Sequence, residues 1–409
     1  MLTRRSALLA SVCLAAGTLR AAAQPHHAAP PAHPAGAHGA KKDQPAAQTD
    51  PATTPIGPVD TTAQWAFIAD FATGAALLEK DADVHMPPSS MTKLMTIYLV
   101  YERLKQGKLK LEDQMLVSER AWRMGGSKMF VQVGTQVAVE DLIRGLIVDS
   151  GNDACIVLAE GIAGSEEQFV EMMNAKAKQF DMTNTHYMNC TGWPDPDQYM
   201  SCRDIATLAR RIILDFPQYY HYDSEKTFKY NNIEQGNRNP LVQRGTADGL
   251  KTGHTEAGGY GLCASTMRGD RRVVLVLNGM KTMRERAEEG ERLMDWAFAN
   301  FEDVTLFTAG DVVERVPVWL GTSPSVPLVG GRDLIVTMPR NWRTTASIKV
   351  SYDTPIQAPV SKGTPLGKLV VSGQGVPNMD VPLLAGEDVP RLGLPGRALA
   401  VLSHYVTGG

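Results

Sequence analysis

Large apolar side chains are spread unevenly along this 409-residue chain, and their distribution decides where the chain can fold. Residues 24–58 consist mostly of Ala, Pro, His, Gly and small polar residues, and they hold too few large apolar side chains to bury a core. We therefore expect this stretch to be a disordered, extended tether. From Trp65 onward, apolar residues recur at helix and strand spacings. The remaining chain is too long for one ordinary domain, so two or more cores are expected.

The first 23 residues have the pattern of an export signal. Arg4 and Arg5 precede an apolar run over 7–19, and small residues at 21–23 follow as a cleavage site. The run is too short to cross a bilayer, which needs about 20 residues. We predict a signal peptide over 1–23 that is removed from an exported protein.

Charge argues against a nucleic-acid partner. The net charge is −3, and removal of residues 1–23 takes away three arginines and no acid, which leaves −6. A nucleic-acid-binding domain would carry a basic patch or stripe, and none is evident here.

Four cysteines remain after the signal, at positions 155, 190, 202 and 263. Their spacing matches no zinc pattern, so no metal site is expected from them. Thiols can pair in an oxidising compartment, and Cys190 and Cys202 are the closest pair in sequence. The sequence therefore allows either a disulfide between Cys190 and Cys202 or two free thiols. The tether holds four histidines, for which polar spacing is a better interpretation than metal binding.

Residues 59–303 have strands at both ends and helices between them. Hairpins are expected from 66–70 with 75–79 and from 260–267 with 271–277. Helices are expected at about 90–107, 139–147, 152–163, 165–180, 201–215 and 284–300. This order predicts an α+β domain, in which an antiparallel sheet is flanked by a helical cluster.

After about Val304 the pattern changes to short β-type runs separated by Gly and Pro. These runs lie at 312–320, 334–338, 346–352, 368–372 and 379–384. They predict a small all-β domain over 304–390. A tail over 391–409 follows it.

Three short motifs lie at junctions of these predicted elements. Ser90-Met91-Thr92-Lys93 begins a helix, and Ser150-Gly151-Asn152 lies in a turn between two helices. Lys251-Thr252-Gly253 precedes a predicted strand. Each motif alone is a weak signal, whereas all three in this order are much more specific.

The residue types suit nucleophilic catalysis. A serine hydroxyl needs a neighbouring base, and Ser90 and Lys93 are i,i+3 neighbours on a helix. Lysine acts as that base only if burial or a nearby cation lowers its pKa. Lys251 either supplies such a cation or holds a substrate carboxylate. The Ser90 amide lies at a helix N-terminus, where unpaired N–H groups stabilise an oxyanion.

Each motif also has a purely structural interpretation. Ser90 alone would be read as a helix N-cap, and Ser150-Gly151-Asn152 as an ordinary turn. Lys251 alone would be a solvated charge at a strand end. These interpretations become improbable only when the three motifs are taken together.

The three motifs are those of penicillin-recognising serine enzymes. The wider chain resembles the low-molecular-mass penicillin-binding proteins that act as D-alanyl-D-alanine carboxypeptidases. The matching stretches are PPSSMTKLMT at 87–96, GLIVDSGNDACIVLAEGIAG at 145–164 and DGLKTGHTEAGGYGLCAS at 248–265. The resemblance runs from about Asp60 to Leu384. It implies a β-lactamase/transpeptidase-like catalytic domain followed by a small β domain.

The resemblance also assigns roles. Ser90 would be the acylated nucleophile, Lys93 its general base, and Ser150 and Asn152 the opposite wall of the cleft. Lys251, Thr252 and Gly253 would form the strand edge along which the peptide lies. The backbone N–H of His254 would be the second oxyanion donor. Arg286 would face the substrate carboxylate, with Arg284 as a competing candidate, and Arg238 resembles a family arginine near the cleft.

The implied reaction removes the terminal D-alanine from peptidoglycan stem peptides that end in D-Ala-D-Ala. A β-lactam would acylate the same serine and leave slowly, and no cofactor is implied. A β-lactamase-type hydrolase and an endopeptidase remain alternatives with the same motifs. A non-catalytic cell-wall-binding protein is an alternative of another class.

Related enzymes often end in an amphipathic helix on the membrane surface. Here about ten helix-compatible residues follow Arg397, with few basic groups. We predict a periplasmic protein with peripheral attachment to the inner membrane through the tail.

Overall fold

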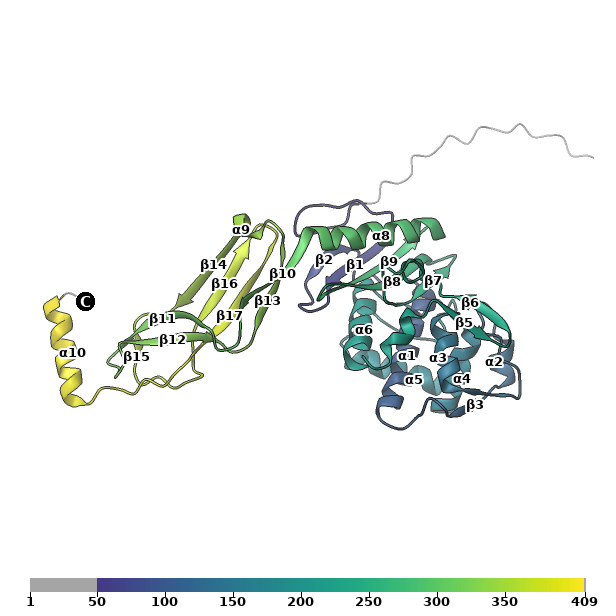
Figure 1. The fold of residues 1–409 in the computed structure, drawn as a ribbon, viewed down its shortest axis with the longest axis horizontal. Helices are drawn as coiled ribbons and strands as arrows, with labels where there is room; N and C mark the ends of the chain where they lie inside the picture. The colour runs from purple at the N-terminus through teal and green to yellow at the C-terminus, as the bar shows by residue number, and fades with distance from the viewer. Residues whose placement is uncertain (1–49, 408–409) are drawn as a thin grey trace, which may run out of the picture. The chain divides into compact units, whose positions relative to one another are not determined.

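A computed structural model describes residues 50–407 (Figure 1). The predicted signal peptide and residues 24–49 of the predicted tether lie outside the described residues. The end of the predicted tether, residues 50–58, packs against the folded chain. Ala52 is buried and pairs with Val59, and Thr53 pairs with Glu79. The folded chain therefore begins earlier than the apolar pattern suggests, because backbone pairing rather than large side chains holds this segment.

An antiparallel sheet of five strands, in the order β2-β1-β9-β8-β7, forms the centre of the N-terminal domain. The strands are β1 (Trp65–Asp70), β2 (Ala76–Lys80), β7 (Thr252–Thr255), β8 (Gly259–Arg268) and β9 (Arg271–Met280). Both expected hairpins are confirmed. Strand β7 forms one edge of the sheet, where the family resemblance, but not the apolar pattern, predicted a strand edge at residues 251–253.

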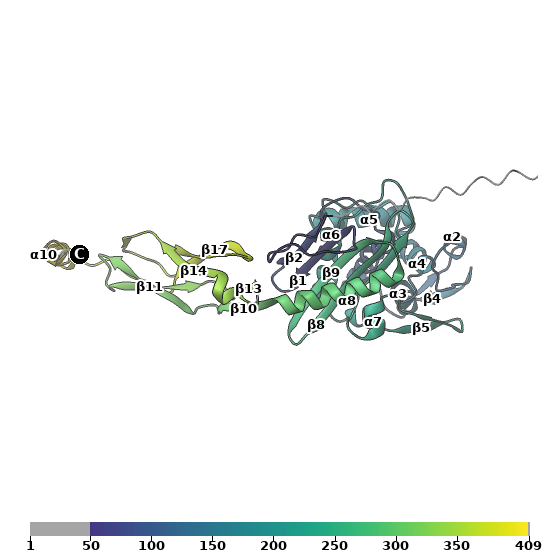
Figure 2. The ribbon, with the colours of Figure 1, turned by 90° about the horizontal axis from the view of Figure 1, so that it is seen from above.

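Both faces of this sheet are covered, which explains why β8 and β9 are apolar almost throughout. Successive side chains of a strand point to opposite faces. Val274 and Val276 accordingly join the core under the helical cluster, whereas Val273, Leu275 and Leu277 join the core under helix α8. Helix α8 (Met283–Asn300) lies across β8 and β9 (Figure 2).

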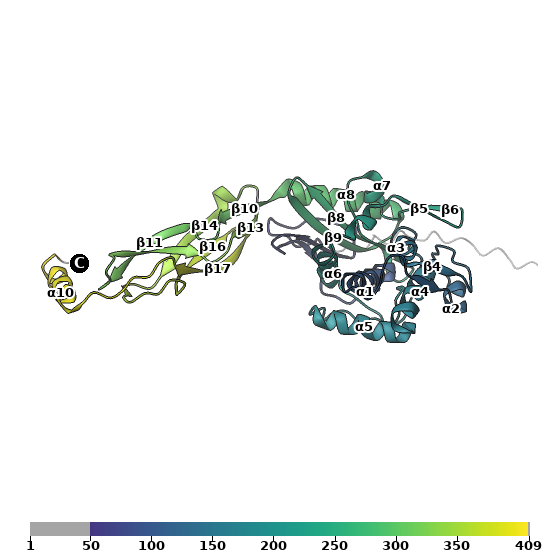
Figure 3. The same ribbon diagram turned by 60° about the horizontal axis from the view of Figure 1, so that its bottom comes forward.

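The helical cluster packs on the face of the sheet away from α8 (Figure 3). Its longer helices are α1 (Lys93–Lys105), α3 (Val139–Ile147), α4 (Asn152–Ala163), α5 (Glu166–Gln179) and α6 (Cys202–Asp215). The expected helices match these within a few residues. Serine hydroxyls cap two of them, because Ser165 accepts from the Gln168 amide and Ser201 from the Asp204 amide.

Short elements complete this domain, and most of them were not predicted. They are η1 (Ser89–Thr92), β3 (Gln114–Leu116), α2 (Glu119–Arg123), β4 (Gln136–Ala138), η2 (Tyr220–Ser224), β5 (Thr227–Tyr230), β6 (Ile233–Gly236) and α7 (Pro240–Arg244).

The C-terminal part is a β domain with its own apolar core. Strands β14-β16-β17-β12-β11-β15 form one sheet, and β10 pairs with β13. The elements are β10 (Phe301–Phe307), β11 (Val312–Trp319), β12 (Ser325–Gly330), β13 (Leu334–Pro339), α9 (Trp342–Thr345), β14 (Ala346–Tyr352), β15 (Ile356–Gln357), β16 (Pro365–Gly373), β17 (Val376–Ala385) and α10 (Leu394–Thr407). All five expected β runs are strands. The expected boundary at 303/304 falls inside β10, because α8 passes directly into this strand.

The described cysteines are all buried free thiols. Cys190 Sγ contacts Glu166 Oε1 at 3.3 Å, and Cys202 Sγ contacts Met86 Sδ at 3.9 Å. Of the two alternatives for Cys190 and Cys202, the structure therefore shows two free thiols and not a disulfide. The expected α+β domain followed by an all-β domain is confirmed.

Candidate active site

Ser90 lies in the 3₁₀ turn η1, which leads directly into α1 and places Lys93 at its first residue. Pro88 precedes this turn as its N-cap, and its ring suits a helix start because it lacks an N–H. Lys93 Nζ lies 3.0 Å from Ser90 Oγ. The i,i+3 spacing read from the sequence thus becomes a direct contact between an amine and a hydroxyl.

Lys93 is fully buried, and its amine has three acceptors. Besides Ser90 Oγ, Nζ donates to Asn152 Oδ1 at 2.6 Å and to the Thr191 carbonyl at 2.5 Å. Burial lowers the pKa of Lys93 from its usual value because it disfavours the ammonium form, and Arg238 lowers it further. A lowered pKa is what a general base for a serine hydroxyl needs.

Asn152 begins helix α4 and is held at both ends of its side chain. Its Oδ1 accepts from Lys93, and its Nδ2 donates to the Gly125 carbonyl at 2.8 Å. Its backbone N–H donates to the Ser127 carbonyl at 2.7 Å. These bonds fix the orientation of the amide beside Ser90.

Ser150 lies in the turn between α3 and α4 with a positive φ of 59°. Lys251 Nζ donates to Ser150 Oγ at 2.9 Å. Burial lowers the pKa of Lys251 well below its usual value, and the nearby charges of Lys93 and Arg238 add to this effect. Two buried lysines therefore each contact a serine hydroxyl.

Edge strand β7 packs against η1. A Cβ on Gly253 would lie 3.0 Å from the Pro88 carbonyl oxygen. Gly192 allows an even closer approach, because it has a φ of 83° and a Cβ there would overlap the Ser89 carbonyl oxygen. Any larger residue at 192 would push this segment away from Ser89 and Ser90.

A pocket of about 610 Å³ opens beside Ser90, and we call it the cationic pocket. Its lining includes Ser90, Ser150, Thr252, Arg238, Arg244 and Arg286, and no Asp or Glu is among its described lining residues. Among the ion pairs of the described residues, none includes Lys93, Lys251, Arg238 or Arg286. The pocket therefore suits a carboxylate.

The structure distinguishes the two arginine candidates. Arg286 is buried and lines the pocket, and its Nε has no hydrogen-bond partner among the described residues. Burial lowers the pKa of Arg286 to about 10. Arg284 is 85% exposed and pairs with Glu288 at 2.7 Å. Of the two arginines, only Arg286 lines the pocket.

His254 follows the glycine of the third motif on β7 and lines the same pocket. Its ring stacks on Tyr260 with centroids 3.9 Å apart, so the side chain lies against the sheet. The backbone of His254 therefore lies on the edge strand that packs against η1.

Some residues that shape the site were not predicted. Asp153 accepts from the backbone N–H groups of Met129, Phe130 and Val131, which holds the neighbouring loop. Thr191 supplies a carbonyl to Lys93. No motif marks either role, since a backbone acceptor can belong to any residue type. The role of Asp153 could have been suspected only from its place directly after Asn152.

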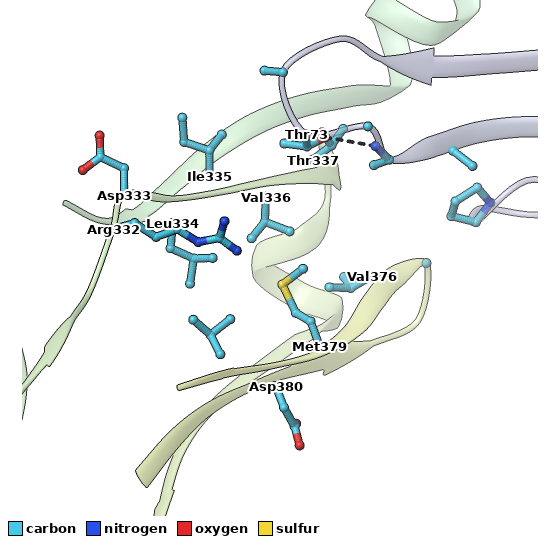
Figure 4. Close-up of a pocket in the computed structure, with 17 residues that line it drawn as sticks. Thr73, Arg332, Asp333, Leu334, Ile335, Val336, Thr337, Val376, Met379 and Asp380 are labelled. Carbon is cyan, nitrogen blue, oxygen red and sulfur yellow. Dashed lines mark hydrogen bonds between the residues drawn. The ribbon is translucent and has the colours of Figure 1, made fainter. Parts of the chain in front are cut away.

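A larger pocket of about 890 Å³ lies away from these motifs (Figure 4). Residues of the β1–β2 turn and of β13 and β17 line it, and no motif residue is among them. Among the described residues there is no group of three or more His, Cys, Asp or Glu that could hold a metal ion. The motif residues Ser90, Ser150 and Thr252 therefore line the cationic pocket and not this larger pocket.

Two family models match this chain. The model of D-alanyl-D-alanine carboxypeptidase matches residues 49–282, and that of the penicillin-binding protein 5 C-terminal domain matches residues 301–391. D-alanyl-D-alanine carboxypeptidase DacA of Haemophilus influenzae is 39% identical over 351 residues, which cover 84% of this chain and 89% of that protein.

Solved structures agree with this relationship. Penicillin binding protein 5 from Haemophilus influenzae has a TM-score of 0.73 at 39% identity and covers 82% of this chain and 100% of its own. Penicillin-binding protein D2 from Listeria monocytogenes in its ampicillin-bound form has a TM-score of 0.54 at 26% identity, over 58% of this chain and 98% of its own. The chain therefore belongs to the D-alanyl-D-alanine carboxypeptidase family of penicillin-binding serine peptidases.

Proposed function

We propose that Ser90 is the nucleophile with which this carboxypeptidase releases the terminal D-alanine of peptidoglycan stem peptides. The observation that supports this role most directly is the buried Lys93 amine, 3.0 Å from Ser90 Oγ. An amine with a lowered pKa can accept the hydroxyl proton as the oxygen attacks. The adjacent Ser89 has no lysine partner among the described residues, since its Oγ pairs with Thr255 Oγ1.

The proposed reaction has two steps. Ser90 Oγ attacks the carbonyl carbon of the penultimate D-alanine, and its proton passes to Lys93 Nζ. The backbone N–H groups of Ser90 and His254 stabilise the oxyanion. The C–N bond then breaks as the proton that Lys93 accepted passes through Ser150, which Lys251 contacts, to the leaving amine, so that Lys93 is neutral again. Water hydrolyses the ester in the second step and restores Ser90.

The cationic pocket would orient the bound peptide. The C-terminal carboxylate of the peptide would meet Arg286, Thr252 and the Lys251–Ser150 pair. Asn152 would hold the amide on the acyl side of the scissile bond. A preference for a free terminal carboxylate is expected because three arginines, Arg238, Arg244 and Arg286, line this pocket.

The first test is the covalent adduct. Incubation with a penicillin should add its mass to a peptide that contains Ser90, whereas Ser90→Ala should form no adduct. Ser89→Ala is the matched control and should still be labelled, because Ser89 bonds to Thr255 rather than to Lys93. Intact-protein and peptide mass spectrometry measure both. An undiminished adduct in Ser90→Ala, or rapid penicillin turnover without D-alanine release, would contradict the proposal.

The second test concerns carboxylate recognition. Arg286→Gln removes a charged donor, which is worth about 1.5–3 kcal/mol, so kcat/KM for D-alanine release should fall about 10- to 100-fold. Arg284→Gln should stay within about two-fold of the wild type, because Arg284 is exposed and pairs with Glu288. Equal losses of kcat/KM in both variants would contradict the role of Arg286 in carboxylate recognition.

The third test uses pH. Lys93 can accept the serine proton only as a neutral amine, so acylation should decline as the pH falls below the lowered pKa of Lys93. Arg238 lowers this pKa, so Arg238→Gln should raise it and move the acid limb to higher pH. Arg244→Gln, whose wild-type side chain pairs with Glu291, should leave the limb in place. The rate of acylation by a penicillin against pH measures both, and a limb unmoved in Arg238→Gln contradicts this role for Lys93.

We also propose that the protein works in the periplasm, with helix α10 attached to the outer face of the inner membrane. No helix in the described part of the chain is long and apolar enough to cross a membrane. Leu394, Leu399 and Leu402 of α10 are exposed, and the i,i+3 spacing of Leu399 and Leu402 places these two on one side of the helix. Such an apolar side favours the interface of a bilayer.

Deletion of residues 391–409 tests this attachment. The shortened protein should lose its co-sedimentation with anionic phospholipid vesicles and keep its penicillin labelling, because α10 contributes nothing to the cationic pocket. Vesicle sedimentation of the two proteins compares them. Unchanged partitioning would show that the tail is not the anchor.

A further inference from the structure

A second pocket borders the start of η1 at Ser89, the residue before Ser90. It has a volume of about 520 Å³, and its lining includes Pro88, Ser89, Trp193, Asp195, Tyr199 and Thr255. We call it the aromatic pocket. No residue of the proposed reaction mechanism lines it.

Two elements connect the pockets. Strand β7 contributes Thr252 to the cationic pocket and Thr255 to the aromatic pocket. The turn η1 and its cap contribute Ser90 to the first and Ser89 to the second. With the terminal carboxylate in the cationic pocket and the scissile carbonyl at Ser90, the acyl part of a peptide must extend along β7 toward the aromatic pocket.

The two pockets differ in charge. Arginines and no acids line the cationic pocket, whereas Asp195 and no Lys or Arg line the aromatic pocket among the described residues. Asp195 Oδ1 accepts from the Asp197 amide at 2.9 Å, which holds the carboxylate in a turn. Its Oδ2 receives no hydrogen bond from the described residues, so it remains able to bind a cation.

Trp193 is held rigidly although it is 46% exposed. Asn189 Oδ1 accepts from the backbone N–H groups of Gly192 and Trp193 at 2.8 and 2.9 Å. The same loop supplies the Thr191 carbonyl that contacts Lys93. The indole lies against the Gly125–Gly126 segment, where a Cβ on Gly125 would be 3.2 Å from Cη2. The ring is therefore fixed relative to the nucleophile while one part of it remains exposed.

The opposite side of the pocket is also aromatic. His85 stacks on Tyr199 with centroids 3.9 Å apart and an interplanar angle of 11°. Aromatic rings and proline side chains pack well against methylene groups, and an aromatic face attracts a cation. A long aliphatic side chain that ends in an ammonium group matches this lining and the Asp195 carboxylate.

We infer that the aromatic pocket binds the residue that precedes D-Ala-D-Ala and selects a basic side chain there, with Trp193 and Asp195 as the specificity-determining residues. This inference rests on the proposed function, because it places the scissile carbonyl at Ser90. It identifies the preferred substrate class as stem peptides with a free amino group on that residue.

The test compares two peptides that differ in one amine. Both end in D-Ala-D-Ala and carry lysine before it, with the side chain free in one and Nε-acetylated in the other. The wild type should favour the free amine at least about five-fold in kcat/KM, the size expected of one cation–π contact. Trp193→Ala and Asp195→Asn should each bring the ratio close to one, and Trp193→Phe should retain part of it.

Asp197→Asn is the matched control, because Asp197 is an exposed acid two residues from Asp195 and does not line the pocket. It should keep the wild-type ratio. The ratio is the measurement because damage to the acylation machinery lowers both rates alike. Equal rates on the two peptides in the wild type, or a ratio that survives in Trp193→Ala and Asp195→Asn, would overturn the inference. Absence of D-alanine release from both peptides would instead overturn the proposed function.

Discussion

The desolvation of Lys93 is the constraint on which the rest of the site depends. A lysine without contact to bulk water loses the hydration that favours its charged form, so it needs acceptors in fixed positions. Those acceptors come from three separate segments: Ser90 on η1, Asn152 at the start of α4, and the Thr191 carbonyl. The burial that lowers its pKa therefore also ties the helical cluster to the turn that carries the nucleophile.

This close approach requires unusual backbone geometry. Ser89 and Ser150 both have positive φ, which costs free energy for residues other than glycine. Gly192 lets the segment that carries Thr191 meet the Ser89 backbone, where a side chain would clash. The strained residues flank the reacting groups, and the packed helices around them hold the strain. The site is thus rigid because its surroundings are buried, not because its own backbone is relaxed.

How far the sequence predicts this molecule depends on the kind of residue involved. The apolar pattern located strands β8 and β9 and the long helices, because buried side chains recur at the spacing of each element. The three motifs located Ser90 and Asn152, which contact Lys93. Side-chain patterns could not reveal the Thr191 carbonyl or the edge strand β7, since the first is a backbone group and the second is held by pairing with β8; only the family resemblance predicted a strand edge at residues 251–253. The choice between Arg284 and Arg286 also needed the structure. Residues two positions apart on a helix differ by about 200° around its axis, so Arg286 faces the pocket while Arg284 faces solvent.

The same geometry bears on the second half of the proposed reaction. No carboxylate of the described residues contacts Ser90, and the acids nearest in sequence to Asn152 are engaged or buried elsewhere. Asp153 binds backbone N–H groups, and burial raises the pKa of Asp149 to about 7. In the proposed mechanism, Lys93, which contacts Ser90 Oγ, would also activate the hydrolytic water once D-alanine has left the cationic pocket. A β-lactam keeps its leaving group covalently attached after ring opening, so in the proposed mechanism its carboxylate would stay beside Arg286 and the pocket would stay filled. Slow hydrolysis of that adduct would then be expected, because water could not enter until the leaving group had departed.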